Sequence, residues 1–337
     1  MKVGQHQKEK TKNKMLKSSQ SYQSNESQFR QYLESRELAK VTQKEYIASV
    51  KRFFVWAKKE DIQITKPDIL KYLEYLKKRG LQNITRSNHL LALNHYFTNL
   101  YQSGQIAANP CLLLKIRGKN KKQLHKIYTP DELDEFFDNY YQLFVRNYND
   151  SRHRHEQQRQ YSILYRERNA LITSILFNQG TSTSEIEKIE TGDIDLIKAT
   201  IQIRGGKRLN DRILPLKATQ IGLFMHYLQN TRPKLLEYQT KESEKLFLPL
   251  PAISYKKAKN EMNRNVFTPL AEQLKSIDKQ FINFTQIRTS IITFWVKTLG
   301  LRKAQYLAGH SNISTTEKYI GNDLENLIDD INKLHPF

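Results

Sequence analysis

Apolar residues recur every three to four positions through the first third of the chain, which is the spacing of helices that bury one face. One such face, within residues 41–60, carries Tyr46, Val50, Phe53, Phe54 and Ala57. Segments 66–80 and 83–104 repeat the pattern, and each ends at a glycine, a common signal for the end of a helix. The pattern predicts about four short helices between residues 25 and 114, packed as a compact helical domain.

A second helical region begins near residue 129. Thr129 can cap a helix, Pro130 suits its first turn, and Glu132 completes a capping box. Segments 166–180 and 285–300 are apolar with helical spacing, and both again end at a glycine. The second part of the chain is therefore also predicted to be mainly helical.

The helical spacing gives way to a period of two in one region. Residues 200–203 and 212–215 alternate between apolar and polar side chains, which predicts two strands joined by the sequence GGKRLND. The His- and Arg-rich segment 151–160 matches no zinc-binding spacing and is interpreted as a solvated helix face. The predicted fold class is mainly α with a small β-sheet.

The charge of the chain points to the kind of partner it binds. Its 337 residues, enough for about two domains, carry a formal net charge of +21, and the pI is about 9.7. Such an excess is typical of proteins that neutralise phosphate groups. The sequence has no long apolar run and no secretory signal, and its single cysteine, Cys111, excludes an internal disulfide and argues against thiolate metal sites. We therefore expect a soluble, cytoplasmic protein that binds nucleic acid.

Three further segments flank the predicted domains. Residues 1–24 are polar and lysine-rich, and predict a disordered basic arm that either has no role or grasps DNA. Residues 115–126 form a basic linker that is either simply solvated or, as we favour, follows a phosphate backbone. The tail 322–337 carries an apolar helical stripe, which needs another surface to bury it.

Four segments resemble motifs of the tyrosine recombinases, the phage integrase superfamily, and they occur in the family's order. LAGHSNISTTEKYIG (307–321) is similar to the C-terminal signature, in which a tyrosine follows a Gly-His pair by nine residues. TQIRTS (285–290) stands where the family has His-x-x-Arg. Residues 201–216 resemble the hairpin that carries a catalytic lysine, and residues 178–195 resemble the Gly-x-Arg-x-Ser-Glu region. The resemblance covers about residues 25–325.

The resemblance implies a role for each matched residue. Tyr319 would attack a DNA phosphate and form a 3′-phosphotyrosyl link, which conserves the bond energy while the strand is open. Arg288 and His310 would donate hydrogen bonds to the non-bridging oxygens as negative charge develops there. Lys207 would protonate the departing 5′-hydroxyl, although the neighbouring Arg208 leaves that assignment open. No metal or cofactor is implied.

Two positions depart from the family's pattern. Ser182 occupies the position of the first arginine, and Thr285 replaces the histidine of His-x-x-Arg. Because serine cannot offer a charged fork, we hypothesise that a hairpin arginine replaces the missing one, which could be Arg204, Arg208 or Arg212. Arg212 is the least suited of the hairpin arginines, because it matches a residue that accompanies the lysine in ordinary members.

The family's architecture also implies domains and partners. A SAM-like core-binding domain would span residues 25–114, and a mixed α+β catalytic domain would span residues 127–321. Expected partners are double-stranded DNA, further copies of the chain in a homo-tetramer on two DNA sites, and accessory proteins that bend DNA or set direction. The tail 322–337 would dock onto the next protomer or pack on its own domain. The candidates for DNA contact are Lys44, Arg86, Lys119, Lys121 and Lys122.

Several alternatives remain open at this point. Glu185 matches the acidic residue that supports the family's site, but a carboxylate on a surface helix is an equal alternative. The function could also be that of a type IB topoisomerase, which shares the chemistry but relaxes supercoils. A catalytically impaired DNA-binding relative, disabled at Ser182 and Thr285, is a further possibility, as is an RNA-binding or architectural protein.

Overall fold

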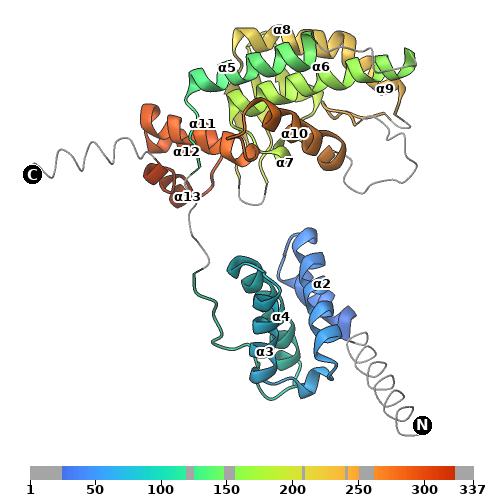
Figure 1. The fold of residues 1–337 in the computed structure, drawn as a ribbon, viewed down its shortest axis with the longest axis vertical. Coiled ribbons are helices and arrows are strands. Elements are labelled where there is room, and N and C mark those ends of the chain that lie inside the picture. The colour runs from blue at the N-terminus through green and yellow to red at the C-terminus, as the bar shows by residue number, and fades with distance from the viewer. Residues whose placement is uncertain are drawn as a thin grey trace, which may run out of the picture. The chain divides into compact units, whose positions relative to one another are not determined.

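The computed structural model divides the chain into two compact units, residues 1–123 and 124–337 (Figure 1). It describes residues 25–118, 125–147, 156–206, 209–239, 242–249 and 262–322. The predicted basic arm, the middle of the predicted basic linker and almost all of the C-terminal tail lie outside the described residues, as does the first half of the His- and Arg-rich segment.

Among the described residues the N-terminal unit has four helices, which confirms the prediction from hydrophobic spacing. They cover residues 25–35, α2 (Lys40–Ala57), α3 (Lys66–Lys78) and α4 (Asn83–Gln102). At the start of α3, Asp68 accepts hydrogen bonds from the backbone nitrogen of Thr65 at 3.0 Å and from its hydroxyl at 2.8 Å. Gly80 and Gly104 follow α3 and α4 with φ values of 80° and 72°, a conformation that favours glycine.

Aromatic rings fill the core of the N-terminal unit. The ring of Phe53 on α2 lies 5.0 Å from that of Tyr72 on α3 and 6.3 Å from that of Phe97 on α4, and both contacts are edge-to-face. All three side chains are buried. The face of α2 that the sequence marks as apolar therefore lies against the other helices of this unit.

The C-terminal unit is mainly helical with one small sheet, as predicted. Its helices are α5 (Pro130–Tyr141), α6 (Glu156–Gln179), α7 (Thr183–Ile186), α8 (Ala218–His226), α9 (Arg232–Glu237), α10 (Thr268–Ile277), α11 (Phe284–Leu299), α12 (Leu301–Ala308) and α13 (Ile313–Glu317). The predicted capping box at the start of α5 is present: Thr129 N donates to Glu132 Oε2 at 2.8 Å, and Glu132 N donates to Thr129 Oγ1 at 3.2 Å.

The sheet contains β1 (Ile194–Asp195), β2 (Thr200–Ile203) and β3 (Arg212–Pro215), all antiparallel and paired in that order. The two predicted strands are β2 and β3. In their register Ile201 pairs with Leu214, and Ile203 pairs with Arg212. Because side chains alternate along a strand, the buried side of β3 carries both Leu214 and Arg212. An arginine thus points into the domain from a hydrophobic face.

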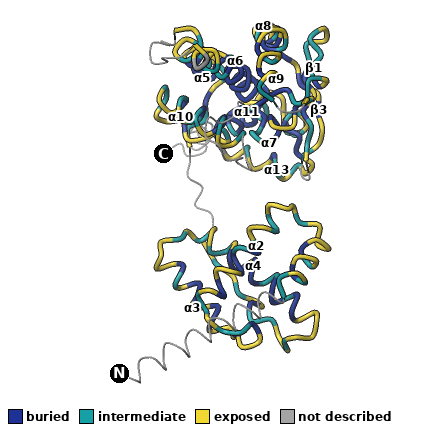
Figure 2. The backbone as a smooth tube through the Cα atoms, turned by 90° about the vertical axis from the view of Figure 1, so that its right-hand side faces the viewer, coloured by how far each residue is buried: buried dark blue, intermediate teal, exposed yellow. Residues whose placement is uncertain are grey.

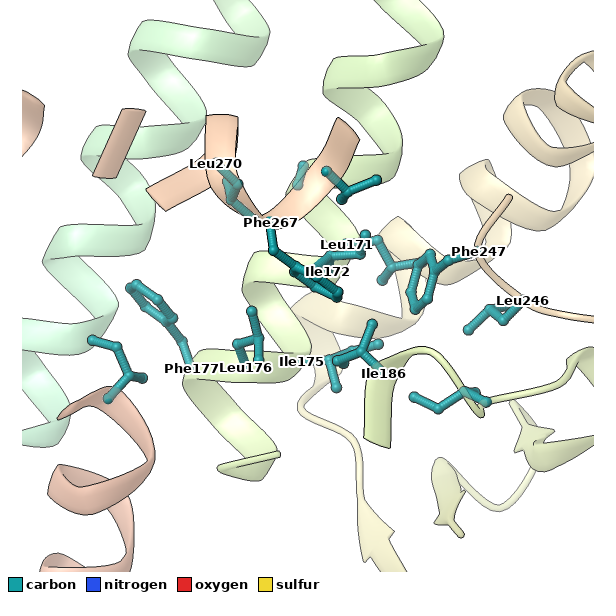
Figure 3. Close-up of a cluster of buried hydrophobic side chains, with 14 of the residues drawn as sticks. Leu171, Ile172, Ile175, Leu176, Phe177, Ile186, Leu246, Phe247, Phe267 and Leu270 are labelled. Atoms are coloured by element: carbon teal, nitrogen blue, oxygen red, sulfur yellow. The ribbon is translucent and has the colours of Figure 1, made fainter. Parts of the chain in front are cut away.

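Helix α6 forms the centre of the hydrophobic core of the C-terminal unit (Figures 2 and 3). It packs against α5, α8 and α11. Its buried residues Ile172 and Ile175 belong to the same cluster as Ile186 of the short helix α7. This packing holds α7 in place beside the end of α6, and α7 carries Glu185.

Candidate active site

The buried carboxylate of Glu185 lies at the meeting point of several elements. Ser182 is the N-cap of α7, and its backbone nitrogen and its hydroxyl each donate to Glu185 Oε2 at 2.8 Å. Only 1% of Glu185 is exposed. Of the two readings of this residue, the surface carboxylate is therefore wrong.

Two arginines from distant elements share this carboxylate. Arg212 Nη1 on β3 lies 2.6 Å from Glu185 Oε1, and Arg288 Nη1 on α11 lies 3.1 Å from Oε2. Burial alone would raise the pKa of Glu185, but Arg288 and Arg212 hold it below its usual value. The cluster of two cations and one anion carries a net positive charge inside the domain.

Both guanidinium groups also bind backbone carbonyls near helix ends. Arg288 donates to the carbonyl of Gly180 at 2.5 Å and to that of Ala308 at 2.7 Å. Arg212 Nε donates to the carbonyl of Leu307 at 2.7 Å. Carbonyls at the carboxyl ends of helices attract cations. The arginines thereby join α6, β3, α11 and α12 around Glu185.

Gly309 allows the close approach of Arg212. It has a φ of 72°, and a Cβ atom at this position would lie 2.6 Å from Arg212 Nη1. The backbone of the following turn is tied to the hairpin, because Asn210 N donates to the Gly309 carbonyl at 2.7 Å and Leu209 forms a β-bridge with His310. The Gly-His pair of the sequence motif therefore fits against β3 and its turn.

His310 is buried, and its Nδ1 lies 2.9 Å from Thr316 Oγ1 on α13. Burial, followed by the positive charges of Arg288 and Arg212, lowers the pKa of His310 to about 4. At neutral pH the imidazole is therefore uncharged, and it can donate a hydrogen bond from only one ring nitrogen.

Tyr319 stacks on the histidine that precedes it by nine residues. The ring centroids of Tyr319 and His310 are 5.8 Å apart, and the ring planes differ by 20°. Burial raises the pKa of the Tyr319 phenol, while Arg288 acts in the opposite direction. The phenol is therefore protonated at neutral pH in the free protein.

The remaining predicted site residues lie in different surroundings. Thr285 is exposed on the first turn of α11. Arg204 forms ion pairs with Glu190 at 2.5 Å and with Asp193 at 2.9 Å, so its guanidinium is held by carboxylates at the edge of the sheet. Lys207 and Arg208 lie outside the described residues.

Of the two hairpin arginines that the structure describes, Arg204 and Arg212, the one considered least suited, Arg212, lies beside Arg288 and Glu185. The signal for this was present in the sequence. Arg212 and Leu214 alternate with exposed neighbours on one strand, so a buried Leu214 implies an inward-pointing Arg212. Thr316, which contacts His310, was not singled out by the sequence beyond its place in the motif.

The predicted DNA contacts of the N-terminal unit are of two kinds. Lys44 is exposed on α2. Arg86 is half-buried, and its guanidinium donates to Asn83 Oδ1 at 2.5 Å and to the Leu73 carbonyl at 3.4 Å. These hydrogen bonds indicate that Arg86 has, at least in part, a structural role. The linker residues Lys119, Lys121 and Lys122 lie outside the described residues.

No helix in the part of the chain that the structure describes is long and apolar enough to cross a membrane. Within the same residues, no group of three or more His, Cys, Asp or Glu side chains is arranged to hold a metal ion.

Comparison with known proteins gives consistent matches over both units. Residues 155–325 match the phage integrase family, and residues 27–105 match the phage integrase N-terminal SAM-like domain. A tyrosine recombinase of Thermosipho africanus is 24% identical over 83% of this chain and 88% of its own length. The tyrosine recombinase XerC of Bacillus licheniformis is 26% identical over 86% of this chain and 89% of its own length.

Solved structures share the fold. The XerH site-specific recombinase in a post-cleavage complex with palindromic difH matches with a TM-score of 0.65 and 18% identity, over 91% of this chain and 84% of that one. A lambda integrase dimer bound to a core site matches with a TM-score of 0.55 and 14% identity, over 87% of this chain and 93% of that one. The sequence-based resemblance is confirmed, and with the family match covering half of its residues the chain belongs to the phage integrase family.

Proposed function

We propose that this protein is a site-specific DNA recombinase that cuts and rejoins strands through a covalent link between Tyr319 and a 3′-phosphate. The observation that carries the proposal is the stacking of Tyr319 on His310, at 5.8 Å between ring centroids, next to the cluster of Arg288, Arg212 and Glu185. In a phage integrase family member, this is the arrangement that a phosphoryl transfer to tyrosine needs.

The proposed reaction exchanges one phosphoester for another. The Tyr319 oxygen bonds to the scissile phosphorus as the bond from phosphorus to the 5′-oxygen breaks. The phenol loses its proton to solvent, and the departing 5′-oxygen gains one from the general acid. A 5′-hydroxyl from a partner strand then reverses the step and releases Tyr319. Because each step replaces one ester by a similar one, no external energy source is needed.

Arg288 and His310 are the proposed donors to the non-bridging oxygens. The guanidinium of Arg288 is always charged, and its carbonyl and carboxylate partners hold it in one orientation. A donor that is already oriented stabilises the transition state without further reorganisation, and such a donor typically contributes about 10²–10³ in rate.

Lys207 is the proposed general acid. Gly206 and Leu209, which flank Lys207 and Arg208 in the sequence, form a β-bridge with each other, and Leu209 forms another with His310. The ends of the hairpin tip are thus fixed close to His310, which favours a hairpin residue as the source of the proton. Arg208 remains the alternative at this position.

The missing first arginine is proposed to be compensated only in part, by the positive charge that Arg212 adds to the site without contacting the phosphate. Ser182 supplies hydrogen bonds to Glu185 but no charge, whereas Arg212 supplies the second cation. The Arg212 side chain is 0% exposed, so it acts through Glu185 and the end of α12 and does not lie open to DNA. Arg204 is less suited, because two carboxylates already hold it.

The proposed partner is double-stranded DNA, because the XerH recombinase and the lambda integrase of the solved structures are bound to DNA sites. The protein would then act in the nucleoid. Strand exchange between two sites needs four nucleophiles, so we propose a homo-tetramer on two DNA sites, with accessory DNA-bending or directionality proteins in addition. The high positive charge of the chain supports the binding of phosphate backbones.

Covalent trapping on nicked DNA tests the proposal. Genomic fragments that bind the protein are selected first, and duplexes made from them are nicked so that the cleaved end diffuses away and religation fails. We expect a covalent protein–DNA product from the wild type and from Y306F, which alters an exposed tyrosine on α12, and none from Y319F. Normal product from Y319F would overturn the proposal. If wild-type protein binds but forms no product, the impaired DNA-binding relative is the correct reading.

The number of DNA sites that the reaction requires distinguishes a recombinase from a type IB topoisomerase. A recombinase gives joined products only when two sites are present, whereas a topoisomerase relaxes a supercoiled circle that carries one site. We expect rearranged products from two-site plasmids, and relaxation of one-site plasmids without any two-site products would favour the topoisomerase.

A further inference from the structure

We propose that Thr316 is a positioning residue that fixes the protonation pattern of His310, with the proton on Nε2 and the lone pair on Nδ1. The tautomer itself is a property of the folded chain. Only its consequence for DNA cleavage rests on the function proposed above.

The contact between the two residues is short and shielded from water. Thr316 Oγ1 lies 2.9 Å from His310 Nδ1, Thr316 is 0% exposed, and His310 is 5% exposed. Thr316 lies on α13, three residues before Tyr319, so the same short helix that leads to the proposed nucleophile also carries the partner of the histidine. Water cannot readily replace either group.

The direction of this hydrogen bond follows from the groups that each atom can satisfy. A threonine hydroxyl has one proton to donate, and Nδ1 is the only hydrogen-bond partner of the Thr316 side chain in the part of the chain that the structure describes. If Nδ1 carried the proton, the buried hydroxyl proton would have no acceptor there, which is unfavourable. Donation from Thr316 to Nδ1 satisfies both atoms, and the neutral ring then carries its proton on Nε2.

Burial and, after it, the charges around the ring keep it in this neutral form. Arg212 on β3 and Arg288 on α11 disfavour a second proton, and their effect exceeds that of Glu185 on α7. With one proton only, the ring has one donor. Among the described residues none hydrogen-bonds Nε2, so the Nε2 proton is available to a phosphate oxygen. The other tautomer would direct a lone pair at an anion.

Tyr319 also helps to orient the imidazole, because its ring stacks on that of His310. The two rings are nearly parallel, at 20°, so the orientation of the imidazole is set by Tyr319 on its face and by Thr316 at its edge. A valine at 316 would preserve the shape but remove the hydroxyl proton. The ring would then be free to place its proton on either nitrogen, and cleavage would be slower while DNA binding is unchanged.

Long-range ¹H–¹⁵N correlation spectra of the full chain, labelled at histidine, measure the tautomer directly. The signals of His310 are assigned by their loss in H310Q. We expect the wild type at pH 7.5 to have an unprotonated Nδ1 and a protonated Nε2. T316V is expected to lose this pattern, T316S to retain it, and T315V to serve as a matched control that also retains it.

The same variants are then compared in the cleavage of nicked DNA. T316V is expected to cleave about 10-fold more slowly than the wild type with unchanged DNA affinity, while T316S and T315V cleave normally. A wild-type His310 protonated on Nδ1, or a T316V spectrum with the wild-type tautomer, would overturn the proposal. If T316V does not fold, the wild-type and T316S spectra still decide it. Failure of the proposed function, by contrast, would appear as cleavage by Y319F.

Discussion

Glu185 is the residue on which the arrangement of the site depends most. Its carboxylate compensates two buried guanidinium groups, and removal of one partner from a buried ion pair typically costs about 3–5 kcal/mol. E185Q keeps the size and some hydrogen bonds but loses the charge. We expect its free energy of unfolding to fall by about 3 kcal/mol in urea denaturation.

E187Q provides the matched control for that measurement. Glu187 follows on the same short segment but is exposed, so its substitution should change the free energy of unfolding by less than about 0.5 kcal/mol. Equal stabilities of E185Q and E187Q would show that the charge of Glu185 is not needed to hold Arg212 and Arg288.

His310 makes the stability of the fold depend on pH. Its pKa is lowered to about 4 in the folded chain, whereas an unfolded histidine has a pKa of about 6.5. As the pH falls, the unfolded chain takes up a proton on this histidine before the folded chain does. The contribution of the neutral ring to the free energy of unfolding is therefore complete above about pH 6.5 and is lost toward pH 4. The groups that face the ring are Arg288, Arg212, Glu185 and Tyr319.

H310Q isolates this effect. The stability advantage of the wild type over H310Q should shrink by about 2–3 kcal/mol between pH 7 and pH 4, as measured by urea denaturation at several pH values. Glu185 stays charged over most of this range because its own pKa is lowered. A difference between the two proteins that does not vary with pH would contradict the assignment of a neutral, buried His310.

At the level of the elements, the turn between α12 and α13 is the most constrained. Gly309 has a φ of 72°, and a Cβ there would also lie 2.6 Å from Arg212 Nη1. Gly104, at the end of α4, has the same φ but no atom within 4 Å of a Cβ. The two glycines therefore separate backbone strain from steric overlap.

Alanine substitutions at these two positions should differ in cost. G104A is expected to lower the free energy of unfolding by about 1 kcal/mol, because only the left-handed backbone is strained. G309A is expected to cost about 1–3 kcal/mol more, since Arg212 has to move, and to slow DNA cleavage. Equal costs in thermal or urea denaturation would mean that Arg212 is not held against this turn.

The elements were largely predictable because their signals are local. The capping box at Thr129 and Glu132 and the alternation in β3 each lie within a few residues. The contacts that assemble the site, by contrast, join residues that are far apart in the sequence. Arg288 and Glu185 meet across 103 residues, and Arg212 and Glu185 across 27. Sequence motifs could place these residues in one site by resemblance, but could not show that Arg212 and Arg288 share the carboxylate of Glu185.

At the level of the whole molecule, the chain combines two compact units with a formal charge of +21. Such a charge favours binding to DNA of any sequence and makes that binding sensitive to salt. It does not by itself choose a phosphate to attack. We propose that this selection depends on the cluster of the C-terminal unit, where Arg288 and Arg212 are paired with Glu185 and both act electrostatically on His310.

The most direct test of the central claim is to locate the DNA on the protein after trapping on nicked duplexes. The adduct is digested with trypsin and nuclease, and the modified peptide is sequenced by mass spectrometry. The account predicts that the nucleotide remnant is attached through phosphate to Tyr319, in the peptide that follows Lys318. A remnant on any other residue of the chain would contradict it.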